Sequence, residues 1–344
     1  MSANLNRQAL VSVVMLAYNH EPYLRRAIEG VLSQEIDFPI EILIGEDHST
    51  DNTLGIAREY EEKHPNIIRV ITSDHNVGAM KNLQRLESSC RGKYVAYCEG
   101  DDYWHDSTKL RKQVSFLEQH PDYSFIHTEY RTYIIESGQL LLNEGKQPKN
   151  LNDADAYNEM LAGRRAAMTL TVCARHSVLQ DILLSCPECY DPRFLMGDRQ
   201  RWLELARRGR VKCLNEVLAT HLALPESASR SASPDRLLRF RLSSKALIEH
   251  YIEKYDCAPE IKRLARLRAA ILVLHATAEL SDKKTARSII DELRRHRVPI
   301  SMRAFLHYQG SRSPLTKRIT QPMFPAVLLW EKIARRVRRV FISV

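Results

Sequence analysis

The first hundred residues alternate short apolar runs with helical patterns. Residues 11–17 are apolar apart from Ser12, which is typical of a parallel strand covered on both faces. Residues 21–33 then carry apolar side chains at helical spacing. Strands that alternate with helices in this way indicate βαβ crossovers, so we expect an α/β fold with a mostly parallel central sheet. The same patterns predict further strands at 40–44, 67–71 and 94–97 and a helix at 53–63.

The pattern changes near residue 234. Residues 225–234 are rich in Ser and bounded by Pro, which is typical of a linker or an exposed loop. Beyond this stretch the apolar positions follow a helical period, and they predict helices at 237–255, 259–280 and 282–296. We therefore expect an α/β domain at residues 1–233 and a helical region at residues 234–344.

The composition narrows the class of protein. Of the 344 residues, 44% are hydrophobic and 27% are charged, which excludes disordered and collagen-like chains. No apolar run approaches the roughly 18 residues that cross a bilayer, and residues 1–7 lead into the first strand without a signal-peptide pattern. We expect neither an integral membrane protein nor one secreted by that route. The pair Cys186 and Cys189 lacks the second CxxC that a zinc site commonly uses.

Positive charge is concentrated in the helical region. The whole chain has a net charge of +9, whereas residues 235–344 hold 24 Lys and Arg against 10 Asp and Glu. The helical region therefore carries +14 and the rest of the chain −5. Such asymmetry favours an acidic partner, either nucleic acid or anionic lipid. Because no nucleic-acid-binding motif accompanies the charge, we expect no nucleic-acid partner.

Residues 325–344 predict a basic amphipathic helix. On a helix, Trp330, Ile333 and Val337 share one side and most arginines lie on the others. This arrangement is typical of an element that binds an anionic membrane surface. The helix could instead pack on the net-acidic first region.

Polar residues follow each of the four predicted strands. In a parallel sheet, ligands bind beyond the carboxyl ends of the strands. Each group has a structural alternative, since residues 49–52 could cap a helix and residues 76–78 could form only a turn. Four groups on one edge nevertheless favour a ligand site. The groups are residues 18–20, 45–53, 74–78 and 99–104.

The adjacent carboxylates of Asp101 and Asp102 carry the clearest chemistry. They repel each other unless a cation or a proton intervenes, although they could also be solvated turn residues. Mg²⁺ and similar hard cations are commonly bound by one or two carboxylates and a substrate phosphate. We therefore expect Mn²⁺ or Mg²⁺ together with a diphosphate. Neither a Walker motif nor GxGxxG follows the first strand, which excludes P-loop and dinucleotide-binding folds.

Four motifs in a fixed order resemble family 2 glycosyltransferases, which are inverting enzymes with the GT-A fold. They are residues 12–19 (Ser-Val-Val-Met-Leu-Ala-Tyr-Asn), 46–53 (Glu-Asp-His-Ser-Thr-Asp-Asn-Thr), 76–78 (Asn-Val-Gly) and 99–102 (Glu-Gly-Asp-Asp). The resemblance covers roughly residues 10–230. It implies transfer of a sugar from a nucleotide-diphosphate donor, a UDP-sugar, to a hydroxyl of a glycan or lipid-linked glycan. It also implies a cytoplasmic enzyme at the inner face of the cell membrane.

The resemblance assigns roles to single residues. Tyr18 matches the aromatic that stacks on the donor base, and Asp47 matches the carboxylate that accepts a hydrogen bond from uracil. Asp101 matches an acid near the sugar and ribose that also serves the metal, and Asp102 matches the direct metal ligand. His48 stands where the family usually has Gly. The full set of implied donor-binding residues is Ala17, Tyr18, Asn19, Glu21, Asp47, Asn76, Gly78, Lys81 and Asp101.

Two later residues complete the implied site. Residues 194–202 resemble the family's motif before a helix, which makes Asp198 the catalytic base, although Asp198 could merely cap that helix. Many members carry Tyr-Arg-x-His where this chain has Thr-His-Leu-Ala at residues 220–223. His221 then contacts the diphosphate, or it is a core or surface histidine.

Two other functions are compatible with parts of the pattern. The chain could be a catalytically inactive GT-A-like domain that its basic tail tethers to a membrane as an assembly factor. A nucleotidyltransferase would also use metal-binding acids. That class usually has a Gly-rich loop after the first strand, and residues 18–20 lack one.

Overall fold

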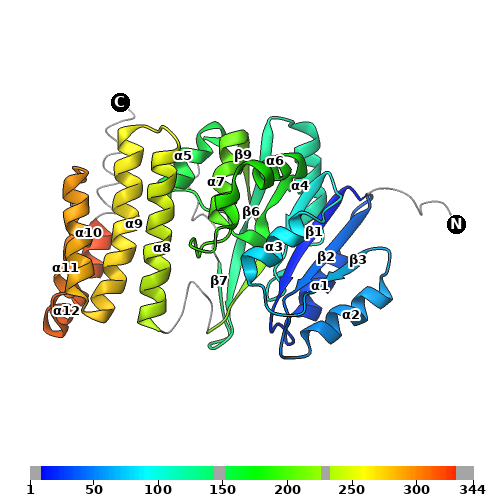
Figure 1. Ribbon diagram of the computed structural model, residues 1–344, viewed down its shortest axis with the longest axis horizontal. Helices are drawn as coiled ribbons and strands as arrows, with labels where there is room; N and C mark the ends of the chain where they lie inside the picture. Colours follow the sequence, from blue (N-terminus) through cyan, green and yellow to red (C-terminus); the bar gives the residue numbers. More distant parts are fainter. Residues whose placement is uncertain (1–8, 143–151, 226–232, 331–344) are drawn as a thin grey trace. The chain divides into compact units, whose positions relative to one another are not determined.

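The computed structural model describes residues 9–142, 152–225 and 233–330. The chain divides into two compact units. The first unit comprises Met1–Met160 and Arg164–Leu224, and the second comprises Leu161–Gly163 and Pro225–Val344. The first unit contains a nine-stranded sheet, and the second is helical (Figure 1). The domain boundary at residue 233 remains a prediction, and residues 226–232 of the Ser-rich stretch lie outside the described residues.

The first half of the sheet is parallel, as the apolar pattern predicts. β1 pairs in parallel with β2 and with β4, and β2 pairs in parallel with β3. Each crossover passes through a helix, which explains why the β1 side chains are buried on both faces of the sheet. The elements are β1 (Val11–Ala17), α1 (Leu24–Leu32), β2 (Ile40–Glu46), α2 (Thr53–Lys63), β3 (Ile68–Ile71), α3 (Ala79–Glu87) and β4 (Tyr94–Tyr97).

The second half of the sheet is mixed, and the strand order is β3-β2-β1-β4-β8-β6-β9-β5. β8 runs antiparallel to both β4 and β6, whereas β6 and β9 are parallel. β5 joins the edge antiparallel to β9, and β7 pairs with β6. The strands are β5 (Tyr103–Trp104), β6 (Tyr123–Ile134), β7 (Gln139–Leu142), β8 (Cys173–Arg175) and β9 (Arg210–Ala223).

Helices accompany these strands, and α1, α2 and the helix at Lys109–Gln119 pack with the sheet around one apolar core. Met15, Ile44, Tyr94 and Trp104 belong to this core and are essentially inaccessible to solvent. Complete burial of an apolar side chain of this size contributes about 1.5–3 kcal/mol. The helices are α4 (Lys109–Gln119), α5 (Ala156–Leu161), α6 (His176–Ser185) and α7 (Arg199–Arg208), with the short 3₁₀ turns η1 (Asp153–Asp155), η2 (Thr169–Thr171) and η3 (Pro187–Tyr190).

The second unit confirms the three predicted helices and adds two more. Its core includes Val273 and Leu274 of α9, together with Ile289 and Ile290 of α10. Of the predicted helix at 325–344, residues 325–330 are helical and the remainder lies outside the described residues. The elements are α8 (Pro234–Lys254), α9 (Pro259–Leu280), α10 (Lys283–Arg295), α11 (Met302–Gly310), α12 (Pro314–Thr320) and the 3₁₀ turn η4 (Gln321–Met323).

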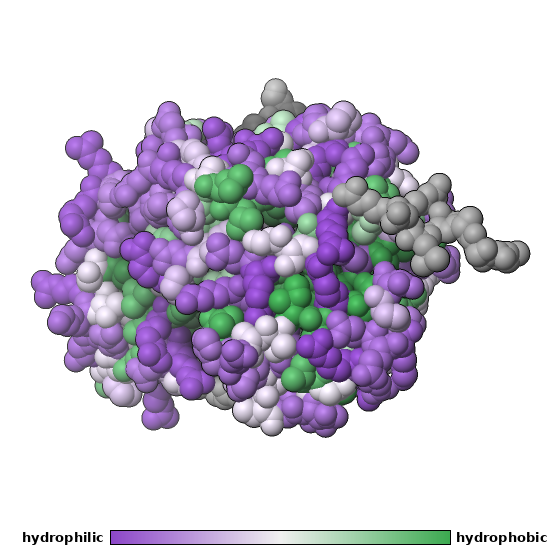
Figure 2. Space-filling view, turned by 45° about the vertical axis from the view of Figure 1, so that its right-hand side comes forward, coloured by the Kyte–Doolittle hydropathy of each residue, from purple (hydrophilic) through white to green (hydrophobic). Residues whose placement is uncertain are grey.

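The residues on the surface are mainly polar, as the composition predicts. Within the described ranges, no helix combines the length and apolarity needed to span a bilayer. Figure 2 shows a face covered mainly by hydrophilic residues, with hydrophobic residues in small separate patches.

Candidate functional site

The four polar groups after β1, β2, β3 and β4 lie at one edge of the sheet. The register pairs Ala17 with Glu46 and Gly45 with Ile71, so β1, β2 and β3 end at neighbouring positions. β4 runs parallel to β1 and ends on the same side. The structure therefore brings together the loops in which the donor-binding residues are predicted.

The side chains after β1 hold the loop after β2. Asn19 Oδ1 accepts a hydrogen bond from the Thr50 amide at 2.9 Å, and Glu21 Oε2 accepts one from the Asn52 amide at 2.9 Å. Tyr18, directly after β1, is exposed, with 43% of its surface accessible to solvent. Asn19 and Glu21 thus order the surroundings of an accessible aromatic ring.

Asp47 holds the loop that precedes α3. Its Oδ1 and Oδ2 accept hydrogen bonds from the amides of Val77 and Gly78, both at 2.9 Å. Asn76 Oδ1 also accepts a hydrogen bond from the Gly78 amide, and Gly78 has φ +86°, a conformation suited to glycine. A carboxylate offers about four acceptor positions, so Asp47 retains capacity for a ligand donor. Lys81 is exposed near the start of α3.

The residues beside Asp47 keep the turn after β2 in place. Glu46 is fully buried, and its carboxylate accepts hydrogen bonds from the Ser49 amide at 2.7 Å and the Thr72 hydroxyl at 3.0 Å. His48 has φ +58°, the left-handed region in which glycine is favoured. A non-glycine residue there costs about 1–2 kcal/mol, so the turn accepts histidine at some cost in stability.

Asp102 is a buried carboxylate with one anchored oxygen. Its Oδ1 accepts hydrogen bonds from His221 Nδ1 at 3.0 Å and from the Leu222 amide at 2.8 Å. The pairing of β5 with β9 aligns Tyr103 with Thr220 and so explains this contact. Asp102 Oδ2 accepts no hydrogen bond from the described residues. Burial raises the pKa of Asp102 to about 6, while the hydrogen bond from His221 opposes the rise.

Asp101 and Glu99 add negative charge at this strand end. Asp101 Oδ2 lies 3.9 Å from His20 Nε2 and is partly exposed. Burial, together with the charges of Asp102, Asp101 and Asp198, raises the pKa of Glu99 well above its ordinary value. Glu99 belongs to the Glu-Gly-Asp-Asp motif, but nothing in the sequence assigns it a role of its own.

Gly100 lies where the acidic loop contacts the end of β1. Its amide donates a hydrogen bond to the Leu16 carbonyl at 2.8 Å, and a Cβ at this position would lie 3.0 Å from that oxygen. The absence of a side chain therefore allows the acidic loop to lie directly against the end of β1.

Asp198 precedes α7, but its side chain makes no capping hydrogen bond with the helix. Instead, Asp198 Oδ2 accepts a hydrogen bond from the Thr169 hydroxyl at 3.1 Å. The helix-capping alternative is therefore wrong, and the carboxylate is close enough to Glu99 to influence its pKa. Thr169 lies in η2, and no pattern in the sequence distinguishes it.

The oxygen atoms after β4 suit a hard divalent cation. Asp101 and Asp102 supply carboxylate oxygens, and Asp102 Oδ2 is not used by the described residues. Burial and, to a lesser extent, the neighbouring negative charges raise the pKa values of Asp102 and Glu99, and a bound cation would offset both effects. Mg²⁺ and Mn²⁺ favour this kind of ligand, so the residues fit such an ion.

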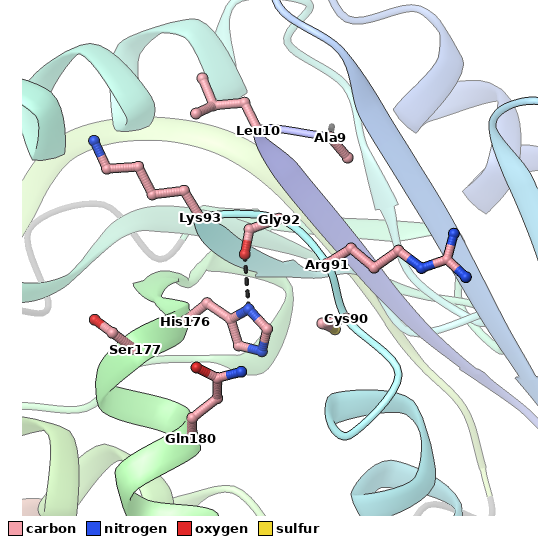
Figure 3. Close-up of a pocket in the computed structure, with 9 residues that line it drawn as sticks. All are labelled: Ala9, Leu10, Cys90, Arg91, Gly92, Lys93, His176, Ser177 and Gln180. Carbon is pink, nitrogen blue, oxygen red and sulfur yellow. Dashed lines mark hydrogen bonds between the residues drawn. The ribbon is translucent and has the colours of Figure 1, made fainter. Parts of the chain in front are cut away.

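A hollow of about 550 Å³ lies at the opposite edge of the sheet (Figure 3). It adjoins the amino ends of β1 and β4, and none of the predicted donor-binding residues lines it. His176 Nδ1 is hydrogen-bonded to the Gly92 carbonyl at 2.7 Å. This hollow is therefore separate from the candidate site. Its lining comprises Ala9, Leu10, Cys90, Arg91, Gly92, Lys93, His176, Ser177 and Gln180.

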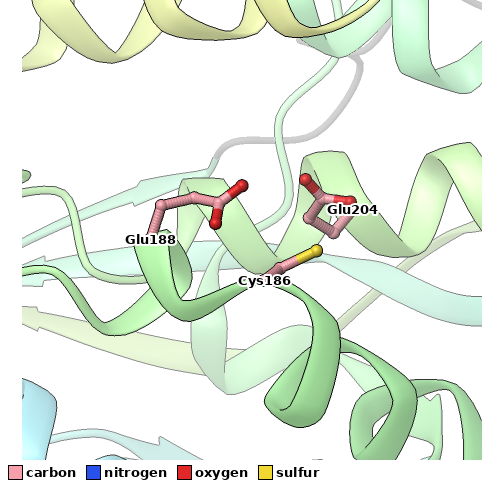
Figure 4. Close-up of side chains that lie close together, drawn as sticks. All are labelled: Cys186, Glu188 and Glu204. Atoms are coloured by element: carbon pink, nitrogen blue, oxygen red, sulfur yellow. The ribbon is translucent and has the colours of Figure 1, made fainter.

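Cys186, Glu188 and Glu204 also lie close together, with potential ligand atoms within 4.8 Å of one another (Figure 4). Arg208 already provides a positive charge there. Its guanidinium donates hydrogen bonds to Glu204 and to Cys186 Sγ, the latter at 3.3 Å. An ion pair therefore accounts for this cluster without a metal.

Comparisons with known proteins agree with the geometry. Residues 12–167 match the family described as Glycosyl transferase family 2. An uncharacterized protein of Mycobacterium tuberculosis is 44% identical over 112 residues, which are 33% of this chain and 32% of that protein. The Escherichia coli protein WfaP, described as a UDP-Glc:alpha-D-GlcNAc-diphosphoundecaprenol beta-1,3-glucosyltransferase, is 28% identical over 49% of this chain and 62% of its own length. The match thus spans about a third of the first relative and under two thirds of the second.

Two solved structures share the fold. S. aureus TarS (residues 1–349), in complex with UDP-GlcNAc, has a TM-score of 0.58 and 17% identity, covering 89% of this chain and 92% of that chain. The mannosyltransferase PcManGT from Pyrobaculum calidifontis, in complex with GDP-Man and Mn²⁺, has a TM-score of 0.55 and 16% identity, covering 96% of this chain and 90% of that chain. At these identities the likeness establishes the GT-A-type α/β fold of the first unit.

Proposed function

We propose that the chain transfers a sugar from a UDP-sugar to a hydroxyl of a glycan or lipid-linked glycan, because residues 12–167 match Glycosyl transferase family 2. The proposal rests mainly on the geometry of Asp102. Its Oδ1 is held by hydrogen bonds from His221 and Leu222, whereas its Oδ2 accepts none from the described residues, and the carboxylates of Glu99 and Asp101 are close by. The names of TarS in complex with UDP-GlcNAc and of WfaP support a UDP-sugar as donor.

Asp198 is the catalytic base in this proposal. The acceptor hydroxyl loses its proton to Asp198 as its oxygen attacks the anomeric carbon, and the bond from that carbon to the diphosphate breaks. This single displacement inverts the anomeric configuration. The hydrogen bond from Thr169 orients the carboxylate, and the absence of a capping bond leaves Asp198 available for proton transfer.

The loops after β1, β2 and β3 bind the donor. Tyr18 stacks on the base, and Asp47 accepts a hydrogen bond from it while holding the loop at Asn76 and Gly78. Asp101 and Asp102 hold a divalent cation, Mn²⁺ or Mg²⁺, as the complex of PcManGT with Mn²⁺ suggests. When bound, the cation supplies positive charge that stabilises the departing diphosphate.

Calorimetry with UDP, with and without Mn²⁺, tests the donor site. We expect Mn²⁺-dependent binding that Asp102→Ala abolishes and Asp198→Asn preserves. A panel of nucleotide sugars then tests catalysis, and Asp198→Asn should lower transfer by about 10²–10⁴-fold. If no nucleotide binds, the proposal fails and the chain is better explained as an inactive assembly factor. Full transfer by Asp198→Asn would assign the base elsewhere.

We also propose that the helical region binds an anionic membrane surface, where a lipid-linked acceptor would be found. Its excess of basic residues supplies the attraction, at about 1 kcal/mol for each Lys or Arg near the lipid. Leu315, Ile319, Met323 and Trp330 are exposed and follow one another at helical spacing. These side chains extend the predicted apolar side of the 325–344 helix toward α12.

Sedimentation with phosphatidylglycerol vesicles tests this contact. The variant Leu315→Glu/Ile319→Glu should bind at least fivefold more weakly than the wild type. Leu184→Glu is the matched control, because Leu184 is also exposed but lies on α6. Equal binding by both variants would contradict a role for the α12 side chains.

A further inference from the structure

A buried ion pair joins α3 to α7 behind the candidate site. Glu87 at the end of α3 and Arg201 on α7 are 4% and 1% exposed, and Arg201 Nε lies 3.3 Å from Glu87 Oε1. The hydroxyls of Tyr97 and Tyr190 donate hydrogen bonds to the same carboxylate, the first at 2.6 Å. Removing one partner of a buried charge pair leaves an uncompensated charge at a large cost in stability, so the pair holds the two helices together.

Arg201 reaches from this pair to the residue before Asp198. Its guanidinium donates a hydrogen bond to the Gly197 carbonyl at 2.5 Å. Burial disfavours the charge of Arg201, but Glu87 outweighs this effect, and the pKa of the guanidinium is raised. Arg201 therefore stays charged, and it holds the backbone directly before the candidate base.

We propose that Glu87 and Arg201 are positioning residues, which fix the Gly197–Asp198 backbone so that the Asp198 carboxylate meets the acceptor hydroxyl. The proposal rests on the function proposed above. Neither residue touches substrate in this account. Glu87 orients Arg201, Arg201 holds the Gly197 carbonyl, and Thr169 fixes the carboxylate from the other side.

The contacts of Arg201 differ from ordinary apolar packing because they combine an ion pair with a directional hydrogen bond. A guanidinium donates along several fixed directions, so Arg201 can form an ion pair with Glu87 and donate a hydrogen bond to the Gly197 carbonyl at the same time. Lysine keeps the charge but lacks this geometry. Glutamine at position 87 keeps the shape but removes the negative charge that holds Arg201.

The test compares Arg201→Lys and Glu87→Gln with the wild type. In both variants we expect kcat for sugar transfer to fall 10–100-fold, while the KM for the donor stays within threefold. Arg208→Lys is the matched control, because it is the same substitution at the other end of α7 and should leave kcat unchanged. Should Glu87→Gln fail to fold, Arg201→Lys carries the test, since it retains the buried charge.

Amide hydrogen exchange of residues 191–202 gives a readout that does not depend on activity. Both variants should exchange faster than the wild type in this segment, and Arg208→Lys should not. Exchange and kcat unchanged in the folded variants would overturn the positioning role. If the wild type transfers no sugar but the exchange result holds, the proposed function fails while the pair's hold on the segment stands.

Discussion

Asp102 and His221 are 119 positions apart in the sequence, yet His221 Nδ1 lies 3.0 Å from Asp102 Oδ1. The contact connects the acidic loop after β4 with β9, the last strand of the first unit. It fixes Oδ1 of Asp102, while Oδ2 accepts no hydrogen bond from the described residues. The candidate metal site is therefore built from two distant segments of the chain.

Replacing His221 with Ala should weaken metal binding. The buried Asp102 carboxylate would lose a charge-assisted hydrogen bond, which contributes about 1.5–3 kcal/mol. Calorimetry at pH 7 should show an affinity for Mn²⁺ and UDP at least tenfold lower. His75→Ala is the control, because His75 is exposed on the loop before α3. An affinity within twofold of the wild type would contradict the anchoring role.

Metal binding should weaken in mild acid. The pKa of Asp102 is raised to about 6, so a proton competes for this carboxylate at a higher pH than for an ordinary aspartate. Affinity for Mn²⁺ should fall by up to tenfold for each unit of pH below about 6. Constant affinity between pH 7 and pH 5 would show that Asp102 does not bind the ion.

The substitution Asp47→Asn should loosen the loop before α3. An amide side chain has one acceptor oxygen, so one of the two hydrogen bonds from the Val77 and Gly78 amides would be lost, although Gly78 would keep its bond to Asn76 Oδ1. Loss of a hydrogen bond to a charged acceptor should lower folding stability by about 1.5–3 kcal/mol or less at these half-buried positions, and UDP affinity should also fall. Chemical denaturation and calorimetry measure the two effects. Asp74→Asn, an exposed change nearby, should alter neither.

Lys109 should make folding stability depend on alkaline pH. Burial lowers the pKa of Lys109 to about 8, although its Nζ donates a hydrogen bond to Gln113 Oε1 at 2.8 Å. Between pH 8 and about 10.5 the unfolded chain holds a proton that the folded protein has released, so stability rises with pH in this window. The wild type should gain about 3 kcal/mol relative to Lys109→Met between pH 7 and pH 10.5.

Denaturation curves of both proteins at several pH values test this prediction. The difference between the two proteins removes the contribution of other titrating groups. A difference that does not change with pH would show that Lys109 keeps an ordinary pKa in the folded protein.

Elements with strong local patterns were predictable from sequence. The predicted bounds of β1, α2, β4 and α9 agree with the structure, because apolar period and Pro259 fix them locally. The loops after the parallel strands also follow from this pattern, since parallel strands place their carboxyl ends on one edge. The roles of residues in these loops came from the family resemblance and remain predictions.

Contacts between distant segments were not predictable. β5 is only two residues long, and its pairing with β9 depends on residues more than a hundred positions later. Thr169 beside Asp198, 29 positions apart, and Arg201 beside Glu87 are likewise contacts between separate segments. Hydrophobic period reports which face of an element is buried, but it does not report which polar groups meet inside the fold.

The position of β6 determines how far the chain can be shortened. Its neighbours β8 and β9 both follow residue 167, where the family match ends. A fragment of residues 12–167 would keep Asp101 and Asp102, but it would expose the edge of β6 that pairs with β9 and leave the other edge paired only with β7. Unpaired strand edges promote pairing between molecules, so such a fragment should aggregate. Any shortened chain intended for crystallisation or assay should extend at least through Ala223.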